Sequence, residues 1–396
     1  MRSPLMRAVV GLLFVGRWAS AGDLDPPAGP VTPTHKTLTE VEPRIAVNAA
    51  NTPGDDLSLF VISEPGSYYL VRPLKGAPGK HGIAIDAHPV TLDLNGFAVP
   101  GTTAALNGIT VRGDHPGLVI RRGDVGGWPG IAVDVSGSIG SVVEDVRVRD
   151  SGTGILGSYA TIVRRCSAAG NLAGGIFVGP SCLVVDSLAR MNSGNGFYAL
   201  DGSQIVRCNA EFNGDDGFYL DGDSCRLERC VALSNGRHGI TSIYSAAIED
   251  SVSERNGQHG IWSPWPCSVA RCAAAQNDLD GISLADEAFL TACAVRANGR
   301  DGLRIGARGL VSGCQATGHS GGAGLRVLGS GNRIESNHFA GNQRGLGIEG
   351  AGNLVIRNSA SGNETNYDIA GGNVAGPIVD AASIATDGSP HANYEH

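Results

Sequence analysis

The chain has 396 residues, 59 of them glycine, and a formal net charge of −8 at pH 7. This acidic balance disfavours nucleic acid as a partner, because phosphate binding needs clustered positive charge. The sequence also lacks the unbroken apolar run of roughly 18 residues or more that a membrane-spanning helix needs.

The first 21 residues are typical of a secretory signal peptide. Arg2 and Arg7 precede a short apolar stretch at 8–15, and Ala19-Ser20-Ala21 offers a cleavage site of small residues. We therefore expect export to a secreted, periplasmic or cell-surface location. Residues 22–65 are rich in Pro, Thr and Asn and are predicted to form a linker and an N-terminal cap.

A glycine followed by an apolar, a variable and usually another apolar residue then recurs at steps of 21 or 22 residues. The repeat glycines are Gly154, Gly175, Gly196, Gly217, Gly239, Gly260, Gly281, Gly302, Gly324 and Gly345. Short alternating segments between Gly and Asn turns predict three short strands per coil of a parallel β-helix, an all-β solenoid, over residues 66–370. Residues 371–396 lose the pattern and are predicted to be a C-terminal cap or tail.

Two further rows repeat with the glycines. One holds asparagine at Asn171, Asn192, Asn213, Asn235, Asn256, Asn277 and Asn298, and we expect its amides to hydrogen-bond to one another inside the turns. The other holds six of the nine cysteines, at Cys166, Cys208, Cys230, Cys272, Cys293 and Cys314. Stacking at about 4.8 Å suits buried thiols, although the same spacing also falls within disulfide range.

These coils resemble the right-handed parallel β-helix repeats of the pectin lyase-like superfamily, which is shared by pectin-degrading enzymes, alginate epimerases and many exported proteins. The resemblance, together with the preference for right-handed crossovers, implies a single-stranded right-handed helix. It specifies the fold well and the function poorly.

The position two after each repeat glycine is expected to point outward, because strand side chains alternate. It is occupied by Phe177, Tyr198, Tyr219, Thr241, Trp262, Ser283, Arg304 and Arg326. Tyr244 and Trp265 follow in the next loops. Flat exposed rings suit stacking against sugars, so Tyr198, Tyr219, Tyr244, Trp262 and Trp265, here called the aromatic strip, predict binding of an extracellular polysaccharide.

The residue before each glycine is polar on successive coils, and we call this row the polar ladder: Asn195, Asp216, His238, His259, Asp280 and Asp301. A carboxylate beside a histidine can act as an acid–base pair. His259 and Asp280 would contact substrate beside the strip. The alternative is a set of solvated turn residues without a role.

Asp215-Asp216, followed one coil later by His238-Gly239, resembles the adjacent aspartates and the Gly-His-Gly motif of polygalacturonase-type glycosidases. The resemblance implies that Asp215, Asp216 and His238 catalyse inverting hydrolysis. The chain departs from that family at Gly194 or Asn195, where a further Asp is expected, and in having no lysine in the regular coils, which follow Lys80.

A lyase or epimerase is a second enzymatic hypothesis, with charge neutralisation by Ca²⁺ or by the arginine row Arg165, Arg207, Arg229 and Arg271. Asp186 and Asp250 interrupt this row, which favours a salt-bridge ladder instead. Calcium could also bind the acidic group Asp215, Asp216, Asp221 and Asp223, although no regular Asp-x-Asp-x-Asp-Gly loop is present. No metal ligand set is assigned.

The prediction is therefore an exported β-helix that binds polysaccharide, with hydrolase or lyase activity as an extension of that role. The competing hypothesis is a non-enzymatic structural or adhesive surface protein. The sequence predicts no oligomeric state.

Overall fold

The computed structural model describes residues 42–384 and 386–396. The predicted signal peptide at 1–21 and residues 22–41 of the predicted linker lie outside the described residues. The chain from Arg44 to His396 forms one compact unit, and all of its regular structure is β. No helix in the described part of the chain has the length and apolar character needed to cross a membrane.

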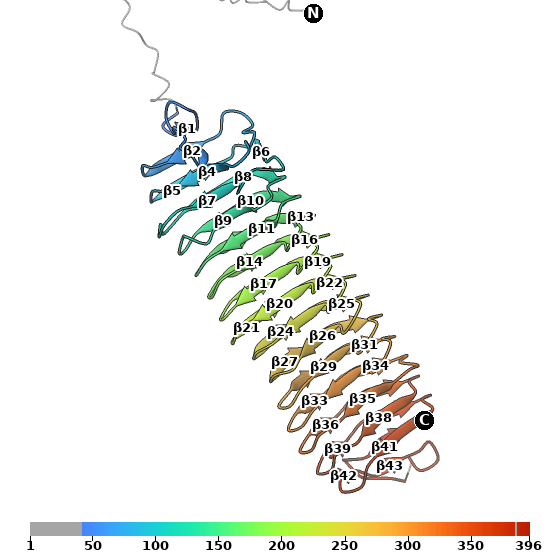
Figure 1. The fold of residues 1–396 in the computed structure, drawn as a ribbon. Coiled ribbons are helices and arrows are strands. Elements are labelled where there is room, and N and C mark those ends of the chain that lie inside the picture. Colours follow the sequence, from blue (N-terminus) through green and yellow to red (C-terminus); the bar gives the residue numbers. More distant parts are fainter. Residues whose placement is uncertain (1–41, 385) are drawn as a thin grey trace, which may run out of the picture. The chain divides into compact units, whose positions relative to one another are not determined.

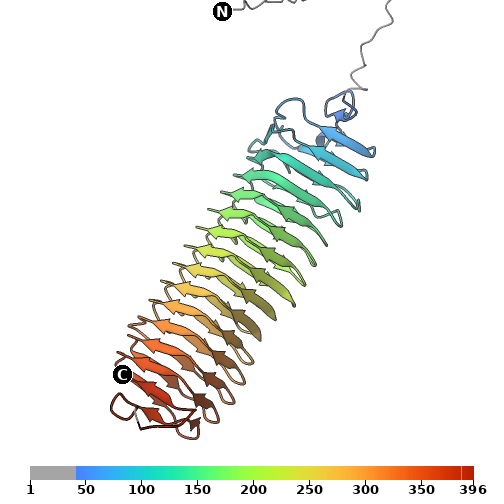
Figure 2. The same ribbon diagram turned by 180° about the vertical axis from the view of Figure 1, so that it is seen from behind.

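The unit is a stack of coils with three short strands each, as the repeat predicts (Figures 1 and 2). The first strands of the coils pair in parallel to form a 15-stranded sheet. Its strands are β2 (Ser58–Ile62), β4 (His81–Ile85), β7 (Ile109–Val111), β9 (Ile131–Val135), β11 (Thr153–Gly157), β14 (Ile176–Val178), β17 (Phe197–Leu200), β20 (Phe218–Asp221), β23 (Ile240–Ser242), β26 (Ile261–Ser263), β29 (Ile282–Leu284), β32 (Leu303–Ile305), β35 (Ala323–Val327), β38 (Arg344–Ile348) and β41 (Thr365–Ile369).

The other strands form two further parallel rows, which the long strands β8 (Val119–Gly126) and β10 (Val142–Arg149) join into one 29-stranded sheet. The second row holds β1 (Ile45–Ala46), β3 (Gly66–Tyr69), β5 (Val90–Asp93), β12 (Ile162–Arg164), β15 (Leu183–Val185), β18 (Gln204–Val206), β21 (Cys225–Glu228), β24 (Ala246–Glu249), β27 (Cys267–Ala270), β30 (Phe289–Thr291), β33 (Leu310–Ser312), β36 (Arg333–Glu335), β39 (Leu354–Ile356) and β42 (Val374–Ala375).

The third row holds β6 (Ala98–Pro100), β13 (Ser167–Ala169), β16 (Leu188–Arg190), β19 (Asn209–Glu211), β22 (Val231–Leu233), β25 (Val252–Glu254), β28 (Ala273–Ala275), β31 (Ala294–Arg296), β34 (Gln315–Thr317), β37 (His338–Ala340), β40 (Ser359–Ser361) and β44 (Asn393–Glu395), with β43 (Ile378–Val379) paired to β44. The stack extends beyond the predicted limits of 66 and 370. β1 and β2 lie before residue 66 and pair with β3 and β4, respectively. β44 lies in the predicted tail and pairs with β40.

The asparagine row forms the predicted ladder inside the turn that leads into the 15-stranded sheet. Between Asn171 and Asn298 each side-chain amide donates to the Oδ1 of the next coil's asparagine, for example at 2.9 Å from Asn213 to Asn235 and at 3.0 Å from Asn235 to Asn256. The same Oδ1 also accepts the backbone N–H of the preceding asparagine. His319 continues the row, and its Nδ1 accepts the N–H of Asn298 at 3.1 Å.

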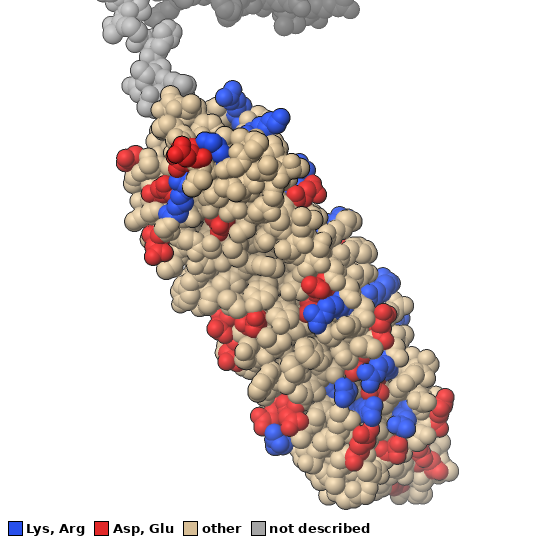
Figure 3. Space-filling view, in the orientation of Figure 1, with Lys and Arg blue, Asp and Glu red and all other residues tan. Residues whose placement is uncertain are grey.

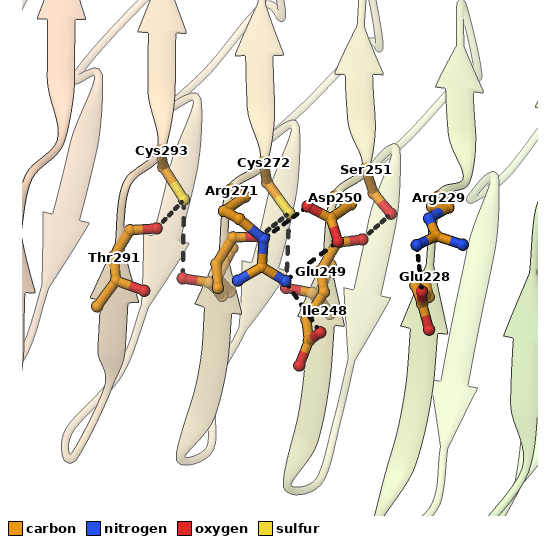
Figure 4. Close-up of polar contacts among 12 residues, drawn as sticks. Glu228, Arg229, Ile248, Glu249, Asp250, Ser251, Arg271, Cys272, Thr291 and Cys293 are labelled. Atoms are coloured by element: carbon orange, nitrogen blue, oxygen red, sulfur yellow. Dashed lines mark hydrogen bonds and ion pairs between the residues drawn. The ribbon is translucent and has the colours of Figure 1, made fainter.

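All nine cysteines are free thiols and all are buried. Burial raises the pKa of Cys225 to about 11, which keeps it protonated. In the row of six cysteines the thiols act as small core groups that also contact the backbone. The Sγ of Cys293, for example, donates to the carbonyl of Thr291 at 3.4 Å (Figure 4).

Candidate functional site

Three residues of the aromatic strip, Tyr198, Tyr219 and Trp262, lie on the outer face of the 15-stranded sheet. Tyr198 of β17 is in register with Tyr219 of β20, and their rings stack with centroids 5.4 Å apart and planes 10° apart. Phe197 and Phe218, one position earlier, point inward and stack in the core at 4.9 Å. The alternation within each strand therefore sends one aromatic to the core and the next to the surface.

Trp262 continues the strip beyond a gap at Thr241. These two residues are in register, but Thr241 is fully buried, which corrects the expectation that every residue of this row is exposed. The Trp262 ring stacks on His238, with centroids 5.1 Å apart and planes 11° apart, and His238 in turn stacks on His259 at 5.3 Å. Trp262 is therefore held in place from one side by the histidines.

Tyr244 and Trp265, the other two residues of the aromatic strip, form a more exposed pair. They follow β23 and β26, and their side chains are 44% and 55% exposed with ring centroids 6.5 Å apart. The two turns are alike, because Ser242 Oγ donates to the Tyr244 carbonyl and Ser263 Oγ donates to the Trp265 carbonyl. The structure thus brings all five predicted strip residues to one side of the stack.

Five of the six polar ladder residues are buried and Asn195 is half-buried, so the interpretation of the ladder as a set of solvated turn residues is wrong. Asp216 and Asp280 have no exposed surface, and His238 and His259 are 5% and 8% exposed. Each of the first five side chains accepts the backbone N–H of the ladder residue on the next coil. The acceptor distances are 3.0 Å at Asn195 Oδ1, 3.0 Å at Asp216 Oδ1, 3.2 Å at His238 Nδ1, 3.2 Å at His259 Nδ1 and 3.0 Å at Asp280 Oδ1.

This hydrogen bond explains which residue types occupy the ladder. Asn, Asp and neutral His all carry an acceptor at the δ1 position, and the backbone N–H would otherwise be buried without a partner. His238 must therefore leave Nδ1 unprotonated and carry its proton on Nε2. Burial, with the neighbouring His259 and Arg237, lowers the pKa of His238 to about 4.

The predicted catalytic residues differ in their access to solvent. Asp215 is half-buried in the turn before β20, whereas Asp216 is fully buried and uses Oδ1 for the ladder. The other carboxylate oxygen of Asp216 is buried and has no hydrogen-bond partner among the described residues. Burial raises the pKa of Asp216 above its usual value. Both oxygens of Asp216 are therefore unavailable to a polymer lying on the strip.

His238→Asn is expected to make the protein more resistant to acid. Asn keeps the δ1 acceptor, as Asn195 does, but does not titrate. The pKa of His238 is about 4 in the folded protein and about 6.5 unfolded, so the unfolded state takes up the proton first as pH falls. This effect should remove roughly 3 kcal/mol of stability between pH 7 and pH 4 in the natural protein only. Denaturant unfolding at both pH values measures it, and equal acid losses in both proteins would contradict it.

The arginine row lies at a corner between the second and third strand rows and forms ion pairs along the stack. Arg165 pairs with Asp145, Arg207 with Asp186 and Arg271 with Asp250, at 2.7, 2.6 and 2.7 Å. Figure 4 shows Arg271 between Asp250 and Glu249. These arginines are the salt-bridge ladder that the alternation of charges predicts, and they lie on the larger sheet rather than on the strip.

The acidic residues considered for calcium do not converge. Tyr198 donates its hydroxyl hydrogen to Asp221, and Ser245 Oγ donates to Asp223 at 2.9 Å. Within residues 42–384 and 386–396, no group of three or more His, Cys, Asp or Glu side chains is placed to hold a metal ion. Lys and Arg are mixed with Asp and Glu on the face in Figure 3, without a large area of one sign.

Residues 262–373 match a family model described as a right-handed β-helix region. No curated protein matches the chain. Among solved structures, the A-module of mannuronan C-5 epimerase AlgE4 from Azotobacter vinelandii is 15% identical, with a TM-score of 0.43, covering 78% of this chain and 91% of that one. The catalytic unit of a GH87 α-1,3-glucanase from Streptomyces thermodiastaticus is 11% identical, with a TM-score of 0.33, covering 89% and 68%. Identities this low say nothing about the activity of this chain.

Proposed function

We propose that this right-handed parallel β-helix protein is exported and binds an extracellular polysaccharide along the aromatic strip. The observation that carries the proposal is the set of half-exposed rings on neighbouring coils, with Tyr198 stacked on Tyr219 and Trp262 stacked on His238. Sugar rings pack their apolar faces on flat aromatic groups, and rings already fixed by stacking lose little entropy on binding. Tyr244 and Trp265 widen the surface beside this row.

Binding is better supported than catalysis. General acid–base chemistry needs a group within hydrogen-bond reach of the substrate, and the fully buried Asp216 already accepts the N–H of His238. The perturbed pKa values of Asp216 and His238, which can mark a catalytic site, follow here from burial in a structural ladder. A purely structural or adhesive role would leave the aligned exposed aromatics without a purpose.

Polysaccharide binding without product release is therefore expected. The experiment screens neutral and acidic polysaccharides for binding, and in parallel for reducing ends and for unsaturated uronate absorbance. Asp216→Asn is the matched variant, because Asn retains the Oδ1 acceptor of the ladder and should leave the fold unchanged. Turnover that disappears in Asp216→Asn would instead establish a hydrolase or lyase. Absence of binding to every polysaccharide in the screen would favour a structural role.

A further inference from the structure

One face of the Trp262 ring is left uncovered by the fold. Its other face lies on His238, with ring centroids 5.1 Å apart. In the opposite direction along the stack, the residue in register on the next coil is Ser283, which is too small to cover an indole. A depression of about 360 Å³ opens there, lined by Trp262, Pro264, Ser283, Asp286, Arg304 and Leu328 among others.

Arg304 stands on the far side of this depression. Trp262, Ser283 and Arg304 are in register on successive coils, so the tryptophan and the arginine are separated by two strand spacings. Two spacings amount to about 10 Å. A sugar ring in van der Waals contact on both sides needs about 7–8 Å. The depression is thus deep enough along the stack to accept one ring between the indole and the guanidinium group.

The charge of Arg304 is not neutralised by the protein. It forms no ion pair with any described residue, and its Nε is buried without a hydrogen-bond partner. Arg326, next in the same row, differs because it pairs with Glu349 at 2.7 Å and lies 3.8 Å from Asp301. Arg304 as a whole is half-buried, so it keeps its positive charge at the edge of the depression without a carboxylate partner among the described residues.

The one carboxylate in the lining is already engaged. Asp286 Oδ1 accepts the Ala307 N–H at 2.9 Å, and Asp286 Oδ2 lies 3.3 Å from Arg308 Nη2. Arg308 also pairs with Glu287 at 3.1 Å, so the two carboxylates share this cation, and neither of them forms an ion pair with Arg304. The depression combines an apolar platform with an uncompensated cation, which is a combination that selects an anionic ring over a neutral one.

We propose that this depression is a binding subsite for a sugar residue that carries an anionic substituent, either a carboxylate or a sulfate. The ring stacks on the free face of Trp262, and the substituent accepts hydrogen bonds from Arg304. The guanidinium group is planar, and it binds such oxygens by paired N–H donors. This inference rests on the proposed function and specifies its substrate class.

The test compares polymers that differ in charge alone: dextran sulfate with dextran, and polygalacturonate with its methyl ester. The natural protein should bind the anionic member of at least one pair tenfold or more tightly, and which pair shows the preference separates sulfate from carboxylate recognition. Arg304→Gln should abolish the preference and keep the neutral affinity. Arg296→Gln is the control, because Arg296 is an arginine of β31 without an ion pair in the described chain, and its loss changes the net charge equally.

Equal binding of charged and neutral members would overturn the inference, as would a preference that survives in Arg304→Gln or is lost equally in Arg296→Gln. In each of those cases the proposed function still stands if replacement of Tyr219 and Trp262 abolishes binding. Absence of binding to all four polymers would overturn both. Equal unfolding midpoints of the two glutamine variants establish that a changed preference reflects the site rather than the fold.

Discussion

Asn235→Ala is expected to lower the free energy of unfolding by about 4 kcal/mol, because it removes four buried hydrogen bonds, each contributing about 1 kcal/mol. The Asn235 amide donates to Asn256 Oδ1 at 3.0 Å and to the Ala210 carbonyl at 3.1 Å. Its Oδ1 accepts from the Asn213 backbone N–H at 3.1 Å and from the Asn213 side-chain amide at 2.9 Å. No water can replace these contacts easily, since Asn235 is 2% exposed.

Urea unfolding followed by circular dichroism measures the loss. Asn209→Ala is the matched control, because Asn209 is an exposed asparagine of β19 in the same part of the stack. It should change stability by less than about 0.5 kcal/mol. In a solenoid each coil contacts only its neighbours, so Asn235→Ala should also broaden the transition by uncoupling the coils on either side. Equal effects of the two substitutions would show that the ladder contributes nothing.

The architecture could be predicted from the sequence because it repeats. A coil of fixed length places each glycine, cysteine and asparagine on its counterpart, so ten weak local patterns reinforce one another. The ends lack this support. The predicted start at residue 66 misses β1 and β2, whose residues Ile45 and Phe60 nevertheless pair in register with Tyr68 and Ile83. The early coils are longer, so the repeat does not predict the role of Trp128. This residue is fully buried and donates its Nε1 hydrogen to the Val99 carbonyl at 2.8 Å.

The candidate site could be predicted only in part. Alternation within a strand identified the outward row, and it therefore found Tyr198, Tyr219 and Trp262. It could not show that Trp262 would stack on His238, or that Thr241 would be buried, because these outcomes depend on the side-chain rotamers of neighbouring coils. A turn residue that is polar is normally solvated, so its polarity alone does not predict the burial of the polar ladder. The shared δ1 acceptor of Asn, Asp and His was the available signal.

The same alternation places Arg304 and Arg326 in one row, and nothing in the sequence pattern distinguishes the two arginines. Their difference comes from the next coil, where Glu349, directly after β38, forms an ion pair with Arg326. Ion pairing between coils depends on side-chain reach, which spacing alone does not give. Identifying an unpaired cation therefore required coordinates, whereas identifying the row did not.

Replacing both Tyr219 and Trp262 by alanine is expected to weaken polysaccharide binding at least 100-fold. An aromatic anchor at the centre of a binding surface commonly contributes more than about 1.4 kcal/mol, and each such contribution is a tenfold change in Kd. Tyr219 also fixes Tyr198 by stacking at 5.4 Å, so the double variant removes two platforms and loosens a third. Isothermal titration with the tightest polysaccharide of the screen measures the change.

Phe289→Ala is the control for this pair, because Phe289 is 55% exposed but belongs to β30 in the larger sheet. It should leave affinity unchanged. Loss of the Trp262 ring uncovers His238, so thermal unfolding of the double variant is compared with that of Phe289→Ala to separate a lost surface from a lost fold. A folded double variant that binds as tightly as the natural protein would show that the strip does not bind the polymer. Weakening by Phe289→Ala instead would move the binding surface to the larger sheet.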